Sequence, residues 1–159
     1  LLNESDVWKS MQSILENPRV LIKADFESER YFLEQLCEKL KGLRESDIQK
    51  PWPFTAAHGD FAPWNMRLMD GKLALYDCEC FMPLAPLGWD ILYFIFRVEN
   101  LIKRKSLENI WHLFEADAYD ERLSLFESKT GLNIPDKRIL VMLVLFAIAF
   151  DLPAKMTSV

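Results

Sequence analysis

The chain has 159 residues, half of them hydrophobic, and a formal net charge of −5 at pH 7. Its length and apolar content predict one domain with a sizeable core and exclude a disordered chain. The acidic balance argues against a nucleic-acid partner, which needs a basic face, and is compatible with a cationic small molecule.

Helical spacing of apolar residues predicts a first helix from Ser5 or Asp6 to about Glu16, ended by Asn17-Pro18. A second helix is predicted over residues 26–40, with Gly42 as its C-cap. Residues 54–57 are predicted to be a short strand or an extended lead-in to the segment that follows.

Two short strands are predicted over Met66–Met69 and Lys72–Tyr76, because Asp70-Gly71 between them is a strong two-residue hairpin signal. The rest of the chain is predicted to be helical, over residues 89–98, 100–115 and 119–128 and from near Asp136 onward. The predicted class is therefore α+β, mainly helical with one small antiparallel hairpin.

The last helix contains twelve consecutive apolar residues, 139–150. About 20 are needed to span a bilayer, so we expect a buried core helix and no membrane partner. Three cysteines, an odd count without a disulfide framework, favour the reducing cytoplasm.

Polar residues flank the predicted hairpin on both sides. His58-Gly59-Asp60 and Asn65 precede it, and Asp77 follows it. Phosphoryl transfer needs an acceptor for the attacking hydroxyl and hard oxygen ligands for Mg²⁺. Asp60 suits the first task, and Asn65 and Asp77 suit the second. Because a hairpin returns the chain to its start, Asp77 is predicted to lie beside Asn65.

Neighbouring residues are given supporting roles. His58 is counted among the candidate catalytic residues because it precedes Asp60. Its expected role is that of a structural hydrogen-bonding group. Glu79 is expected to brace the loop or to contact a second metal ion. Asp90 precedes an apolar helix, so it is first a candidate N-cap, and it is also considered as a brace for the catalytic loop.

The segment from about residue 55 to 95 resembles the aminoglycoside phosphotransferase and choline kinase-like family. His58-Gly59-Asp60 through Asn65 matches the family's H-G-D-x-x-x-x-N loop, and Asp77-Cys78-Glu79 is similar to its D-x-E segment, without the usual Trp. The resemblance implies a protein-kinase-like fold, with Asp60 as catalytic base and Asn65 and Asp77 holding Mg²⁺. It also implies transfer of the γ-phosphoryl group of ATP or GTP to a hydroxyl of a small molecule such as an aminoglycoside or an amino alcohol.

Kinase-type enzymes also have a small lobe with a Gly-rich loop and a phosphate-binding Lys. The five glycines here are widely separated, and no strand-rich segment precedes residue 58. We therefore interpret residues 1–159 as a single domain, the large C-terminal lobe. The missing N-terminal lobe of the same protein becomes the expected partner, and the isolated lobe is expected to be inactive.

Three alternatives stay open. A non-catalytic, kinase-like binding domain is disfavoured because Asp60, Asn65 and Asp77 are all present. A protein kinase is disfavoured because Gly59 stands where His-Arg-Asp has Arg, and because Asp77-Cys78-Glu79 replaces Asp-Phe-Gly. A purely helical interaction module would make the three-part spacing a coincidence.

Overall fold

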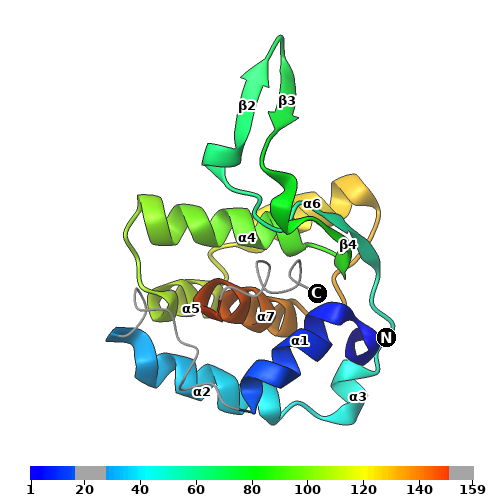
Figure 1. The fold of residues 1–159 in the computed structure, drawn as a ribbon, viewed down its shortest axis with the longest axis vertical. Coiled ribbons are helices and arrows are strands. Elements are labelled where there is room, and N and C mark those ends of the chain that lie inside the picture. Colours follow the sequence, from blue (N-terminus) through cyan, green and yellow to red (C-terminus); the bar gives the residue numbers. More distant parts are fainter. Residues whose placement is uncertain (17–27, 151–159) are drawn as a thin grey trace.

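The computed structural model describes residues 1–16 and 28–150. Within these ranges the chain is mainly helical, with two two-stranded antiparallel sheets. The last helix, α7 (Lys137–Phe150), passes through the middle of the molecule and packs against α2 (Arg30–Lys41) and α4 (Trp89–Arg97) (Figure 1). Every residue from 139 to 150 is buried, as expected for a helix that is apolar on all sides.

The buried helix explains the longest apolar run in the sequence. None of the helices in the described ranges combines the length and apolarity that crossing a bilayer requires. Helix α7 is instead surrounded by other elements, so its apolar side chains form the centre of the core.

The amino-terminal helices follow the predicted pattern. Helix α1 spans Asp6–Leu15, and Ser5 caps it by accepting a hydrogen bond from the backbone N–H of Trp8 at 3.2 Å. Helix α2 ends at Gly42, as predicted. The expected helix end at Asn17-Pro18 and the expected start of the second helix at Phe26 lie outside the described residues.

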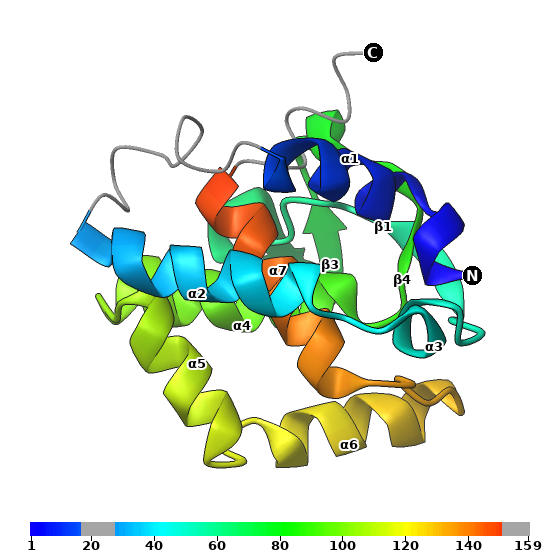
Figure 2. The same cartoon turned by 90° about the horizontal axis from the view of Figure 1, so that it is seen from below.

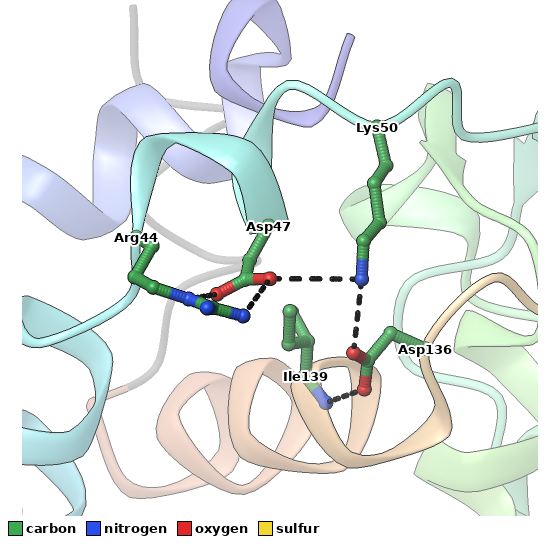
Figure 3. Close-up of polar contacts among 5 residues, drawn as sticks. All are labelled: Arg44, Asp47, Lys50, Asp136 and Ile139. Carbon is green, nitrogen blue, oxygen red and sulfur yellow. Dashed lines mark hydrogen bonds and ion pairs between the residues drawn. The ribbon is translucent and has the colours of Figure 1, made fainter.

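A short helix, α3 (Glu45–Ile48), is tied to the start of α7 by ion pairs (Figure 3). Lys50 lies 3.7 Å from Asp47 and 3.6 Å from Asp136. Asp136 also accepts the backbone N–H of Ile139 at 3.0 Å, which caps the first turn of α7. The ion pair between Lys50 and Asp136 therefore holds the polar linker between α2 and the first strand against the start of α7.

The described residues contain four strands in two separate antiparallel pairs. The sequence analysis predicted only one of these pairs, the hairpin, and missed the other. The hairpin β2 (Met66–Met69) and β3 (Lys72–Leu75) is confirmed, and Figure 1 shows it projecting away from the helices. The second pair joins β1 (Phe54–Ala57) to β4 (Met82–Pro86). Sequence pattern missed β4 because prolines at both ends obscure the strand signal.

The segment after α4 differs from the predicted helix over residues 100–115. The chain first makes a π-helical turn at Val98–Ile102, and α5 (Leu107–Glu115) begins only after Ser106, which accepts the backbone N–H of Asn109. Ser106 is an N-cap, so the helix starts there. Helix α6 (Asp120–Thr130) follows and lies on the opposite side of α7 from α1 (Figure 2).

Candidate functional site

The loop that carries Asp60 begins directly after β1, where Gly59 allows two distant segments to meet. Gly59 has a φ of +83°, and a Cβ at this position would overlap the backbone carbonyl of Cys80. Only glycine accommodates both the left-handed conformation and the close approach. The loop after β1 is thereby packed against the turn Cys78–Cys80 that follows Asp77.

The Asp90 side chain fixes the backbone of this loop by two hydrogen bonds. Its carboxylate accepts the backbone N–H groups of His58 at 2.8 Å and Gly59 at 3.2 Å. Burial raises the pKa of Asp90, and the two N–H groups oppose that rise. The N-cap prediction for Asp90 is wrong, since Gly88 is the N-cap of α4, whereas its additional predicted role as a brace is confirmed by these two hydrogen bonds.

His58 connects the loop to the hairpin. Its Nε2 lies 2.7 Å from the backbone carbonyl oxygen of Tyr76. A carbonyl oxygen only accepts, so Nε2 carries a proton and donates it. Nδ1 is buried and has no hydrogen-bond partner within the described residues. These contacts fit the expected structural role, because the ring is occupied with positioning the chain beside Asp77.

Asp60 and Asn65 are paired directly. The side-chain nitrogen of Asn65 donates to Oδ2 of Asp60 at 2.8 Å and to the backbone carbonyl of Asp60 at 2.9 Å. Asn65 is buried, so this geometry is well constrained. The other carboxylate oxygen of Asp60, Oδ1, is buried without a hydrogen-bond partner in the described part of the chain. Such an oxygen can accept a hydrogen bond from water or from a ligand.

The hairpin brings Asp77 back to Asn65, as predicted. The backbone N–H of Tyr76 donates to the carbonyl of Asn65 at 2.9 Å, and the ladder continues with Met66 opposite Leu75. Asp77 is exposed and has a φ of +58°, a conformation that non-glycine residues rarely adopt and that is enriched at functional sites. The turn therefore presents its carboxylate at the base of the hairpin.

Glu79 lies in the turn Cys78–Cys80 and is exposed. Its side chain forms no hydrogen bond or ion pair with any residue in the described ranges, so it does not brace the loop in that way. This leaves the carboxylate available to a ligand.

The donor set at the hairpin base suits Mg²⁺. The hydrogen bonds of the Asn65 side chain are made by its nitrogen, so its amide oxygen stays available beside the Asp77 turn. Mg²⁺ is bound by one or two protein oxygens together with water and substrate phosphates. Nowhere in the described residues do three or more His, Cys, Asp or Glu side chains form a metal-binding group.

Helix α4 supplies two residues that the sequence analysis missed. Tyr93 and Arg97 lie one turn apart on the side of α4 that carries Asp90, and the Arg97 guanidinium stacks over the rings of Trp64 at 5.3 Å and Tyr93 at 5.8 Å. Burial raises the pKa of the Tyr93 hydroxyl, Arg97 opposes the rise and the Asp60 carboxylate adds to it. The signal in the sequence was the helical spacing of 90, 93 and 97.

Trp64 lies next to Asn65 in the loop that precedes the hairpin. Its side chain is 45% exposed, so it is not a core residue. Stacking on Arg97 holds it at the rim of the site.

Comparisons with known proteins give no relative. The chain matches no family model, no curated protein and no solved structure.

Proposed function

We propose that the chain is the large catalytic lobe of a small-molecule phosphotransferase with a protein-kinase-like fold. The reaction transfers the γ-phosphoryl group of ATP or GTP to a hydroxyl of a small-molecule acceptor. The observation that carries this proposal is the direct pairing of Asp60 with Asn65, with the Asp77 turn returned beside Asn65 by the hairpin. Packing of the core does not require that Asp60, Asn65 and Asp77, whose side chains are of the types that bind metal ions, lie together at the base of one hairpin.

Asp60 is the residue that contacts the acceptor hydroxyl. Its Oδ2 is held by Asn65, while its Oδ1 accepts no hydrogen bond of good geometry within the described residues, although the Tyr93 hydroxyl lies close to the same carboxylate. The substrate hydroxyl would supply that hydrogen bond, which orients the oxygen in line with the phosphoryl group and provides a place for its proton. The Asn65 bond keeps the carboxylate in one orientation, and correct orientation accounts for much of this type of catalysis.

Asn65 and Asp77 would hold Mg²⁺ through the amide oxygen and the carboxylate, and Glu79 is near enough in sequence to assist. The cation supplies charge neutralisation at the phosphate oxygens. Asp90 and His58 act as positioning residues, since one fixes the backbone of the catalytic loop and the other fixes the chain at Tyr76.

The projecting hairpin is the surface on which a second lobe of the same protein would rest. Leu68 is 77% exposed and Leu73 is 54% exposed, and other apolar side chains of the hairpin are exposed with them. Apolar side chains grouped on an element that projects from the body mark an interaction site. A lobe placed there would close the nucleotide site from above the Asp77 turn.

We place this reaction in the cytoplasm. All three cysteines are free thiols, as a reducing compartment requires.

The test is Mg²⁺-dependent nucleotide turnover by the full-length protein with a panel of hydroxyl acceptors. Asp60→Ala should abolish acceptor-stimulated turnover, and Asp77→Ala should lower it together with the affinity for Mg²⁺-nucleotide. Asp70→Ala in the hairpin turn is the matched control, because it removes a carboxylate from the same hairpin without touching the site.

Two results would contradict the proposal. Wild-type turnover by Asp60→Ala would remove Asp60 from the mechanism. Binding of Mg²⁺-nucleotide without turnover on any acceptor would instead favour a non-catalytic, kinase-like binding domain.

A further inference from the structure

A cavity of about 670 Å³ lies between α4 and α6. Volumes of about 300–1,000 Å³ are usual for small-molecule sites. Its wall on the α4 side is one apolar stripe, Ile91, Phe94, Ile95 and Val98, and α6 adds Phe126. The body of a ligand in this cavity would therefore be apolar.

The charged residues of the cavity are all cations. Lys103, Arg122 and Lys129 line it, and no Asp or Glu does so among the described residues. Lys103 is paired with Glu99 at 2.6 Å. Arg122 and Lys129 form no ion pair within the described ranges. In a chain whose net charge is −5, this local excess of positive charge selects for an anionic group on the ligand.

The cavity shares a residue with the catalytic loop. The ring of Phe94 lies 5.8 Å from the ring of Phe61, centroid to centroid, and Phe61 directly follows Asp60. Asp90 binds the loop backbone from the same helix. Phe94 thus lies between the cavity and the catalytic loop, and a ligand in the cavity would be next to the loop.

Three acidic side chains of the segments that follow α4 are already engaged in ion pairs. Glu99 contacts Lys103 and Lys105, Glu115 contacts Arg138 and Glu127 contacts Lys137. A cationic acceptor would meet only like charges on the cavity wall, whereas an anionic one meets Arg122 and Lys129 directly.

We infer that this cavity binds the acceptor, and that the acceptor is an amphiphile with an apolar body, one anionic group and a hydroxyl. The apolar body fills the α4 stripe, the anionic group lies at Arg122 and Lys129, and the hydroxyl extends past Phe94 to the loop. The identification of this ligand as the acceptor rests on the proposed phosphotransfer function, but its chemical class rests on the cavity alone.

The first experiment measures binding to the 159-residue chain by calorimetry with three probes of equal length. These are 12-hydroxydodecanoate, dodecane-1,12-diol and 12-amino-1-dodecanol, which differ only in the charge of one end. We expect the carboxylate to bind most tightly and the ammonium most weakly. Equal or tighter binding of the ammonium, or no binding of any probe, would overturn the inference.

Variants then locate the site. Arg122→Gln with Lys129→Gln should weaken carboxylate binding about three- to tenfold, the range expected for two exposed ion pairs, and leave diol binding unchanged. Lys9→Gln with Lys39→Gln removes the same charge from α1 and α2 and should change neither. Thermal unfolding of both double variants checks that the fold is intact. An equal loss in the two double variants would mean non-specific charge attraction and would overturn the inference.

Turnover by the full-length protein separates this inference from the proposed function. Asp60-dependent transfer to 12-hydroxydodecanoate, reduced by the Arg122 and Lys129 substitutions, would support both. Transfer only to cationic acceptors would overturn the acceptor class while the phosphotransfer function stands. Selective binding of the carboxylate without transfer to any acceptor would overturn the function while the ligand class stands.

Discussion

The side-chain nitrogen of Asn65 lies 2.8 Å from Oδ2 of Asp60 and fixes the orientation of that carboxylate. The same nitrogen reaches the backbone carbonyl of Asp60, so one buried amide holds both the side chain and the main chain of its partner. The pair therefore contributes to folding stability as well as to the proposed chemistry, and the two contributions can be measured separately.

Asn65→Leu preserves the size of the side chain and removes both donors. We expect it to lower the free energy of unfolding by about 1–3 kcal/mol, because two oxygens of Asp60 lose their partner. Urea unfolding of the 159-residue chain measures this. Asn109→Leu on the exposed side of α5 is the control, with an expected change within about 0.5 kcal/mol. Equal effects at the two positions would show that the Asn65 bonds do not stabilise the loop.

Gly59→Ala should be much more destabilising than Gly71→Ala. Both glycines have positive φ, but a Cβ at 71 meets nothing within 4 Å, whereas one at 59 overlaps the Cys80 carbonyl. The expected loss is about 1–2 kcal/mol at 71 from conformation alone, and about 2–5 kcal/mol at 59 because overpacking is added. Denaturant midpoints of the two variants give the comparison. Similar losses would mean that the two segments do not meet at Gly59.

Asp90→Ala should lower the free energy of unfolding by about 2–4 kcal/mol, because the buried N–H groups of His58 and Gly59 lose their acceptor. The pKa of Asp90 is raised from 3.8 in the folded state. The folded state therefore favours the protonated form, and the contribution of Asp90 falls as pH increases through the raised pKa. Unfolding of both proteins across the acidic range measures the difference, and a difference that grows with pH would contradict this.

Glu99→Gln should show the opposite pH dependence. Burial alone would raise the pKa of Glu99, but hydrogen bonds from Lys103 and Lys105 outweigh it and lower the pKa below 4.5. Its contribution is present above 4.5 and is lost as pH falls through the lowered pKa. We expect the variant to lose about 1–2 kcal/mol at pH 7, a value reduced because both lysines are partly exposed.

The control for Glu99 is Glu108→Gln, which neutralises an exposed acid at the start of α5. It should differ little from wild type at any pH. If the Glu99→Gln difference from wild type stayed constant from pH 7 to pH 3, the ion pairs with the two lysines would not be its source.

Local elements were well predicted because their signals are local. The hairpin follows from Asp70-Gly71 between two apolar runs, and the adjacency of Asn65 and the Asp77 turn follows from the hairpin geometry. Helix α1 follows from its cap at Ser5 and its apolar spacing. The error at residue 100, by contrast, arose because amphipathic spacing continued through a π-helical turn that sequence pattern does not reveal.

The sequence by itself determined the mainly helical class, the hairpin and the candidate residues at its base, since each depends on residues within a few positions of one another. Only the tertiary structure decided the β1–β4 pair, the two bonds that Asp90 makes to the loop and the cavity between α4 and α6. Each of these depends on contacts between segments that are far apart in the chain. Such contacts are set by how the helices pack around α7, and no short stretch of sequence encodes that packing.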